Sequence, residues 1–333
     1  MIKLIKSLFT IEKLPRKGLF PFEWAVLAYA ALTLLVIFFT YTKLSNPEAL
    51  IGGRIRVLII TMALWGLYRM RPCRFFRMLR VLIQMILLSW WYPDTYELNR
   101  IFPNLDHLFA SAEQWFFGCQ PALLFHEKMP WAIFSEVMNY GYVAYYPMIA
   151  VVLYWYFFCR YHEFERASFI VLAAFFIYYV IFIFVPVAGP MFYFQAIGLD
   201  KAAQGIFPNI GLYFNSHTEC LATPGWADGW GYYLVDMAHQ AGERPTAAFP
   251  SSHVGLSTVA ILLAWRTRSK RLLYWLLPFY VSLCFSTVYI QAHYAIDAIM
   301  GFVTGVIIYL VLLRCTRFLV EKPASKRHSK QQS

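Results

Sequence analysis

The sequence has little charge for its length. Charged residues make up only 14% of the 333 residues, whereas 60% are hydrophobic and 19% are aromatic. A soluble domain of this size carries far more charge, so the composition excludes a soluble globular protein and indicates an integral membrane protein. The sequence also lacks a long internal repeat and a coiled-coil heptad, which excludes repeat and coiled-coil architectures.

Cysteine is scarce as well, and the six cysteines have no spacing that suggests a metal site. An HExxH motif is absent too, and we predict neither a metal nor another cofactor. Cys119 and Cys220 fall in the two segments expected on the outer side of the membrane. They could pair in an oxidising compartment or remain free thiols.

Long apolar runs predict an all-α fold, a polytopic membrane helical bundle with about eight transmembrane helices. The spans are expected at roughly 24–42, 54–68, 78–92, 140–158, 167–187, 251–266, 272–290 and 296–314. The second and third are the weakest, because Arg54, Arg56 and Arg80 lie at their edges. Such long side chains could snorkel to the interface.

The distribution of basic residues predicts the orientation of the bundle. If the N-terminus is cytoplasmic, 22 of the 29 Lys and Arg residues fall in cytoplasmic segments, as the positive-inside rule requires. The C-terminus is then cytoplasmic too. The net charge of +11 therefore reflects membrane topology, and we predict no nucleic-acid partner. Short loops favour a bacterial inner membrane.

One polar stretch at the start of an apolar run suits a phosphate better than it suits lipid. It is RPTAAFPSSH, from Arg244 to His253. Ser251 or Ser252 can cap the helix that follows, whose first-turn amides and positive dipole end then face the same point. Arg244 could add a positive charge to this anion site, or it could be an ordinary surface residue.

A second polar motif, HYAID, opens the last apolar run, where His293 and Asp297 share one helix face. A neutral imidazole can attack phosphorus, and the carboxylate of Asp297 would stabilise the developing charge. His253 would protonate the leaving oxygen and later deprotonate the acceptor. The alternatives are structural core histidines and a zinc site, but the pair at i and i+4 is His and Asp rather than two His.

These residues resemble a known family. FPSSH followed by STVYIQAHYAIDAIMG is similar to the second and third motifs of the type 2 phosphatidic acid phosphatase superfamily, and VPVAGP lies where the first motif falls. The similarity is closest to the branch that includes inositol phosphorylceramide synthases. It implies a six-helix core preceded by two extra spans, metal-independent transfer through a phosphohistidine, and an active site outside the cytoplasm.

Carried over residue by residue, the resemblance implies that His293 is the nucleophile, Asp297 its partner and His253 the acid and base. Ser251 and Ser252 would help to bind phosphate. Ser286 and Thr287 stand where the superfamily usually has SR, PSGH has become PSSH, and no KxxxxxxRP motif precedes the loop. A singly charged phosphodiester needs fewer cations than a dianionic monoester, so these departures favour transfer of a phospho-headgroup between lipids.

Two alternative functions remain open. Arg244 could replace a missing cation, which would favour a phosphatase for phosphatidic acid or polyprenyl diphosphate. A non-catalytic transporter of lipid phosphates could use the same site for binding. In each case the expected partners are membrane lipids with phosphate headgroups and the bilayer itself. Gly301 and Gly305 form a GxxxG pattern that allows close approach of a neighbouring helix, with a homodimer contact as the alternative.

The expected organisation follows from these motifs. The segments are 1–92, a basic N-terminal segment and membrane helices; 93–139, an extracytoplasmic interfacial segment; 140–320, the catalytic core with an extracytoplasmic loop at 191–249; and 321–333, a cytoplasmic tail. We expect amphipathic helices in the interfacial segment. Asp106 and His107 there are expected to cap a helix or face solvent, with a chemical role as the alternative. The loop either covers the site and contacts the headgroup or is a structural lid.

Overall fold

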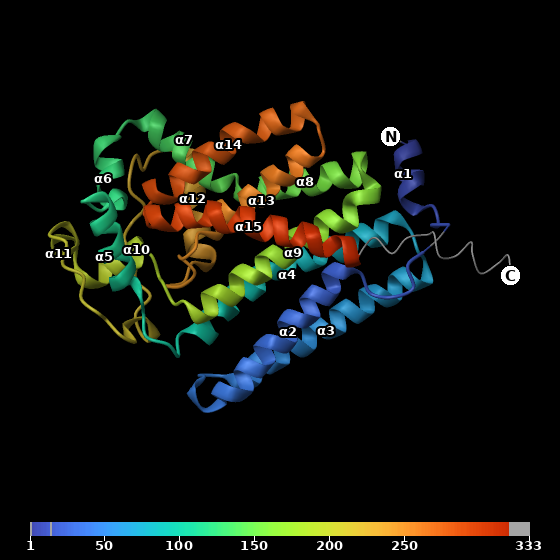
Figure 1. Cartoon of the computed structure of the whole chain (residues 1–333), viewed down its shortest axis with the longest axis horizontal. Helices are drawn as coiled ribbons and strands as arrows, with labels where there is room; N and C mark the ends of the chain where they lie inside the picture. Colours follow the sequence, from blue (N-terminus) through green and yellow to red (C-terminus); the bar gives the residue numbers. More distant parts are fainter. Residues whose placement is uncertain (1, 14, 320–333) are drawn as a thin grey trace.

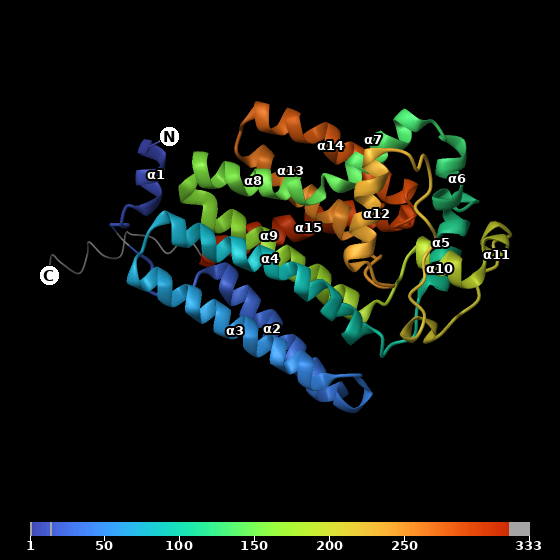
Figure 2. The ribbon, with the colours of Figure 1, turned by 180° about the vertical axis from the view of Figure 1, so that it is seen from behind.

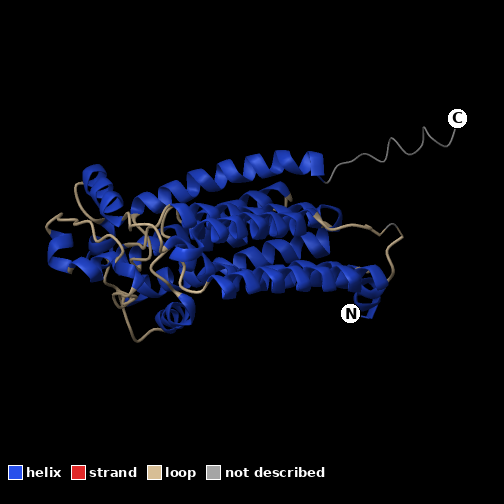
Figure 3. Cartoon of the chain, turned by 90° about the horizontal axis from the view of Figure 1, so that it is seen from below, coloured by secondary structure: helices blue, strands red, loops and turns tan. Residues whose placement is uncertain are grey.

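The computed structural model describes residues 2–13 and 15–319, and within them the chain is helical, with no β-strand (Figures 1 and 3). The predicted tail at 321–333 lies outside the described residues. The helices are α1 (Ile2–Phe9), α2 (Pro21–Thr40), η1 (Tyr41–Lys43), α3 (Pro47–Met70), α4 (Arg74–Asn99), α5 (Asp106–Phe117), α6 (Pro121–Lys128), α7 (Ala132–Val143), α8 (Tyr145–Cys159), α9 (Tyr161–Phe184), α10 (Pro190–Ile197), α11 (Leu199–Ala203), η2 (Tyr213–Asn215), α12 (Trp230–Gly242), α13 (Ser252–Arg266), α14 (Lys270–Tyr289) and α15 (Ala295–Leu319).

Several helices are long and apolar enough to cross a membrane. Among the described residues five qualify, namely α2 with η1, α3, α9, α14 and α15 up to Arg317. The bent pair α7 and α8, which meet at 49°, brings the number to six. The other two predicted spans fall on α4, which carries several charges, and on α13, whose 15 residues are fewer than the ~20 that a bilayer requires. An all-helical membrane bundle is therefore supported, and the count of eight spans stays a prediction.

The expectation that Arg54 and Arg80 snorkel to the interface is wrong. Both side chains are buried. Arg54 makes two hydrogen bonds of 2.7 Å to the carboxylate of Asp94, and Arg80 pairs with Glu23. A buried charge is tolerated when its partner and hydrogen bonds are buried with it, and here the partners come from neighbouring helices. These two ion pairs fasten α3 and α2, respectively, to α4. Arg56, by contrast, is exposed.

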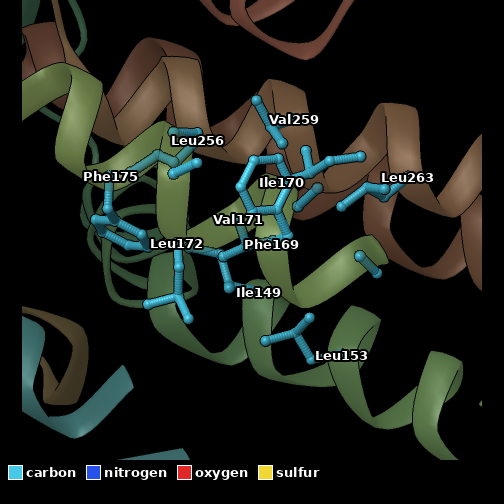
Figure 4. Close-up of a cluster of buried hydrophobic side chains, with 14 of the residues drawn as sticks. Ile149, Leu153, Phe169, Ile170, Val171, Leu172, Phe175, Leu256, Val259 and Leu263 are labelled. Atoms are coloured by element: carbon cyan, nitrogen blue, oxygen red, sulfur yellow. The ribbon is translucent and has the colours of Figure 1, made fainter. Parts of the chain in front are cut away.

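The core of the bundle is built around α9. One side of α9 packs on α2 and α4, and another packs on α8, α13 and α15 (Figure 2). Side chains from α8, α9 and α13 interdigitate in this core, among them Leu153, Phe175 and Leu256 (Figure 4). Most of α9 is apolar on all faces, as expected for a helix enclosed by others.

The two ends of the bundle differ. At one end the turn between α8 and α9 contacts the turn between α13 and α14, where Arg160 donates a hydrogen bond to the Thr267 carbonyl (2.7 Å). The N-terminal segment joins them, because Tyr161 donates to the carboxylate of Glu12 (2.7 Å). At the opposite end lie α5, α6, α10 and α11 (Figure 1). The first two are the short helices expected in the interfacial segment, and Trp115 on α5 is exposed.

Candidate active site

Three polar segments, far apart in the sequence, converge where α13 and α15 begin. The Ala248 N–H donates to the Val187 carbonyl (2.9 Å), and the Ser251 N–H donates to the Asp297 carbonyl (3.0 Å). Gly189 has a φ of +95°, and a Cβ at this position would lie 2.7 Å from the Ala292 carbonyl oxygen. Only glycine permits this close approach. The VPVAGP, PSSH and HYAID motifs therefore meet at one site, as the sequence predicts.

The two histidines of these motifs face each other. His253 Nδ1 lies 3.3 Å from His293 Nε2, and the two ring planes are inclined at 66°. His253 is in the first turn of α13, whereas His293 lies in the short connection between α14 and α15. His293 is buried, with 3% of its surface exposed, and His253 is half-buried. The pair therefore combines a shielded imidazole with a more accessible one.

Hydrogen bonds define the tautomer of each ring. His293 Nδ1 lies 2.8 Å from the Ala248 carbonyl, so this nitrogen must carry a proton. In the neutral ring Nε2 is then an acceptor, and His253 Nδ1–H donates to it. Burial lowers the pKa of His293 to about 4, although the hydrogen bond to Ala248 and the nearby charge of Glu243 act in the opposite direction. His293 is therefore neutral at physiological pH, with an unprotonated Nε2 that accepts from His253 until a substrate takes the place of this hydrogen bond.

Asp297 lies beside the same imidazole, completely buried. Its Oδ2 atom is 3.8 Å from His293 Nδ1 and accepts a hydrogen bond from the Tyr294 N–H (2.9 Å). The carbonyl of Ala248 rather than this carboxylate thus holds the His293 tautomer. Asp297 is close enough to stabilise a positive charge on the ring, and it also orders the first turn of α15.

The three predicted phosphate ligands differ in burial and in their hydrogen bonds. Ser251 is the N-cap of α13, and its side chain accepts from the Val254 N–H (3.4 Å). Ser252 is buried in the first turn of the same helix. Arg244 is exposed, and its side chain makes no hydrogen bond or ion pair with the described residues. Phosphate binding by these three residues stays a prediction.

Aromatic rings surround His253. Tyr142 stacks on it at a centroid distance of 4.7 Å, and Tyr145 packs against it at 4.5 Å. These tyrosines lie on either side of the bend between α7 and α8. The bend therefore lets consecutive helices place two rings against one imidazole, which fixes the ring orientation.

Three parts of the chain contribute to the site although the sequence motifs do not identify them, and Asp106 is the first. Its buried carboxylate accepts hydrogen bonds from the Ala188 and Gly189 N–H groups (2.6 and 2.8 Å) and from the Tyr294 hydroxyl (3.0 Å). It thus joins the loop after α9 to the residue next to His293. The expectation that it caps a helix or faces solvent is wrong, because these distant backbone donors enclose it. No local spacing in the sequence indicates such a contact.

Glu113, on α5, is the second contributor. Its carboxylate accepts a hydrogen bond from the Ile296 N–H at the start of α15 (3.1 Å). Burial raises the pKa of Glu113 to about 8, with a further contribution from the charge of Asp297. Glu113 therefore positions the helix turn that carries Asp297. A lone acidic residue in an amphipathic helix gives no sequence signal for this role.

The end of α12 is the third contributor. His239 on this helix lies near Tyr142, with ring centroids 6.0 Å apart, and its charge would act on His253. Glu243, one turn further on, lies within electrostatic range of His293. The predicted loop at 191–249 thus brings two ionisable side chains to the site. Their i and i+4 spacing, just before RPTAAFPSSH, is the signal that could have identified them.

Other candidate features lie apart from this site. Among residues 2–13 and 15–319, no group of three or more His, Cys, Asp or Glu side chains is arranged to hold a metal ion. Cys119 and Cys220 are both free thiols. Gly301 and Gly305 face α13 of the same chain, since a Cβ at either would lie within 2.6 Å of a carbonyl of Ser251 or Gly255. The GxxxG pattern therefore allows close packing within the chain, as expected.

Comparison with known families matches residues 106–311, more than half of the chain, to the model of the PAP2 superfamily. No match is found among curated proteins or among solved structures. The matched region contains His253, His293 and Asp297 and excludes α1 to α4. It does not distinguish the inositol phosphorylceramide synthase-like branch, which stays a prediction. The family match, together with the motifs and the paired histidines, shows that the chain belongs to the PAP2 superfamily.

Proposed function

We propose that the protein transfers a phospho-headgroup between membrane lipids, through a phosphohistidine formed on His293 at the extracytoplasmic face. The observation that carries this proposal is the pairing of His293 Nε2 with His253 Nδ1 at 3.3 Å, while the other nitrogen of His293 is held by the Ala248 carbonyl. A phosphate that enters between the rings meets a neutral nucleophile on one side and a proton carrier on the other.

In the first step, His293 Nε2 attacks phosphorus and the bond from phosphorus to the leaving lipid oxygen breaks. The negative charge of the bound phosphate favours the protonated form of His253, which takes up a proton with the substrate. His253 then donates this proton to the leaving oxygen, and the lipid departs as an alcohol. The ring of His293 becomes positively charged, and the Ala248 carbonyl and the nearby Asp297 carboxylate stabilise it. The N–H groups of Ser252 and His253 in the first turn of α13 would bind the phosphoryl oxygens.

In the second step, neutral His253 takes the proton of the acceptor hydroxyl. The acceptor oxygen attacks phosphorus and the bond to His293 Nε2 breaks. Both histidines return to their starting state, with His253 protonated. With a lipid alcohol as acceptor the product is a new phospholipid, whereas with water it is a free phosphate or a phosphorylated headgroup.

The charge of the site supports a transferase over a phosphatase. Within the described part of the chain, no Lys or Arg side chain makes a hydrogen bond to His253 or His293. The acidic residue Glu243 is within electrostatic range of His293. A dianionic monoester would be poorly compensated here, whereas a phosphodiester carries one charge. A lipid phosphate phosphatase is the alternative if Arg244 moves toward the substrate.

The test is turnover of the purified protein in detergent with EDTA. Phosphatidic acid, polyprenyl diphosphate and phosphatidylinositol are each supplied with and without ceramide or diacylglycerol. We expect a new phospholipid only when an acceptor is present, and no product from His293→Ala. The matched control is His162→Ala, because His162 is exposed at the far end of the bundle. It should retain full activity.

Each other outcome identifies an alternative. Phosphate release without acceptor would establish a phosphatase, and activity retained by His293→Ala would overturn the phosphohistidine mechanism. A non-catalytic lipid-phosphate transporter predicts binding without turnover, and loss of that binding in His293→Ala. Acid-labile, base-stable label from a phosphorus-labelled donor on the wild-type protein would demonstrate the intermediate directly.

A further inference from the structure

An apolar groove lies along the bundle between α4 and α8. It has a volume of about 220 Å³, and aliphatic, methionine and aromatic side chains line it throughout. The lining residues used below are Leu82 and Ile86 on α4 and Tyr146, Ala150, Leu153 and Phe157 on α8. Leu153 is among the core side chains drawn in Figure 4.

One end of the groove lies next to the aromatic rings that pack on His253. Tyr146, which is 59% exposed, lines this end and packs on Tyr145 at a centroid distance of 4.7 Å. Tyr145 in turn packs on His253 at 4.5 Å. The carboxylate of Glu243 also acts on Tyr146. The groove is therefore two ring contacts away from the residue that we propose as acid and base.

The length of the groove is similar to that of one lipid acyl chain. Tyr146 and Phe157 are 11 residues apart on α8, which corresponds to ~16 Å at the helical rise of 1.5 Å per residue. The hydrocarbon core of a bilayer is about 30 Å thick, so a chain in one leaflet occupies about half of that depth. A linear hydrocarbon chain attached to a headgroup at the histidine pair would run along this groove.

The wall formed by α4 lies outside the region that matches the PAP2 superfamily, whereas α8 lies inside it. This wall is firmly placed. It packs on α9, and the Arg80–Glu23 and Arg54–Asp94 ion pairs fasten it to α2 and α3. The groove is thus a rigid feature that exists because the N-terminal helices pack against the matched region.

We propose that this groove holds one acyl chain of the lipid whose phosphate reacts at His293, so that α4 and α8 select substrates with a long linear chain. The proposal rests on the function proposed above. It commits to an acyl chain of the substrate, because the groove is apolar throughout and Tyr146 at its end packs on Tyr145, which contacts His253. General lipid that coats the bundle would leave the preference for donor chain length unchanged in a variant with a filled groove.

The test fills the groove with one side chain. Ala150→Trp places an indole in it, and Val151→Trp places the same indole on the next residue of α8, which is exposed but does not line the groove. Turnover is measured with a long-chain donor and with its dihexanoyl analogue, whose short chains enter only the mouth. We expect Ala150→Trp to lower kcat/KM at least tenfold for the long-chain donor and less than twofold for the short one. Val151→Trp should change neither. Equal losses for both donors, or none, would overturn the proposal.

A binding measurement separates this proposal from the proposed function. A long-chain phospholipid with a diazirine in its acyl chain is photolysed on the wild-type protein, and the labelled peptides are mapped. We expect label on α4 and α8, removed by excess unlabelled substrate lipid and by Ala150→Trp. Such label without any turnover would show that the groove binds lipid and would refute the proposed enzymatic function. Turnover without label in the groove, or label that substrate lipid does not displace, would refute the proposal that the groove holds an acyl chain of the substrate.

Discussion

The chemistry proposed for His293 depends on the neutrality of its ring. Burial lowers the pKa of His293 to about 4, whereas an unperturbed histidine has a pKa of about 6.5. We expect the rate of phosphohistidine formation not to fall between pH 7 and pH 5, because His293 Nε2 stays unprotonated in this range and the proton donor His253 is more often protonated at lower pH. Rapid-quench measurement of the labelled intermediate in single turnovers checks this. An acidic limb with a midpoint near 6.5 would contradict it.

Glu113 should make stability depend on pH. Its pKa is raised to about 8 in the folded state, so the folded protein binds the proton of Glu113 more tightly than the unfolded chain does. The resulting stabilisation is fully present below about pH 4.5 and is lost as pH rises toward 8 and above. We expect Glu113→Gln, which stays neutral and can still accept from the Ile296 N–H, to flatten the fall in apparent Tm between pH 6 and pH 9.

Glu113→Ala is the matched comparison, since it removes the acceptor as well as the charge. It should lower the apparent Tm at pH 6, where Glu113→Gln should not, because an unpaired N–H at the start of a helix costs about 1 kcal/mol. An unchanged pH dependence in the glutamine variant would show that other groups control the effect.

Single residues were predictable where a motif carries them. His253, His293 and Asp297 follow from short motifs, and the structure brings the three side chains together. Asp106 and Glu113 were not predictable, because each carboxylate binds backbone N–H groups of a segment at least 82 residues away. Every residue except proline has a backbone N–H, so the residue types of a single sequence do not indicate such contacts.

At the scale of helices, the approach of α13 to α15 sets the spacing of the two histidines. A Cβ at Gly305 would lie 2.6 Å from the Gly255 carbonyl oxygen, so the backbones must separate to accept one. We expect Gly305→Ala to destabilise the protein by about 1–3 kcal/mol and to lower activity at least tenfold, because overpacking would shift His253 relative to His293. Apparent Tm and turnover of the purified variant measure the two effects.

Gly66→Ala, on α3, controls for the loss of a helical glycine. No atom would contact the added Cβ there, so the change should be neutral or slightly stabilising. A Gly305→Ala variant that keeps full activity would mean that α13 and α15 can separate without moving the histidines.

The helices themselves were predictable in position but less so in extent. Every expected span falls on helical structure, although the span at 140–158 is divided between α7 and α8, because long apolar runs identify helices well. The third expected span stops before Pro93, yet α4 continues through this residue to Asn99. A proline removes one helical hydrogen bond. The buried pair of Asp94 with Arg54 anchors the turn that follows, and this long-range contact is absent from the local pattern.

At the scale of the whole molecule, composition predicts the membrane class but not the number of crossings. Several helices are short, bent or charged, so length and hydropathy alone support five or six spans within the described residues. The ends of the bundle are better determined. The α8–α9 turn contacts both the N-terminal segment and the α13–α14 turn, and the basic residues of these three segments predict the same side for all of them.

Native cysteines can report which end faces the cytoplasm. Cys220 is exposed on the loop before α12, at the end that carries the histidine pair. Cys159 and Cys315 are exposed next to Arg160 and Arg314, at the opposite end. If the active site is extracytoplasmic, a membrane-impermeant maleimide added to intact cells should label Cys220 and spare Cys159 and Cys315.

The reaction needs alkaline conditions and a matched control. Partial loss of hydration and the charges of Glu243 and Asp236 raise the pKa of the Cys220 thiol, so its reactive thiolate becomes more abundant as pH rises, and labelling at about pH 8.5 is preferable. Cys119 is a half-buried thiol at the same end, so the experiment is done in a Cys119→Ser background. There Cys220→Ser should abolish the signal from intact cells, and permeabilised cells should label all three exposed thiols. Labelling of Cys159 or Cys315 in intact cells, with Cys220 protected, would invert the orientation. The histidine pair would then act on lipids of the cytoplasmic leaflet, because its position within the bundle would be unchanged.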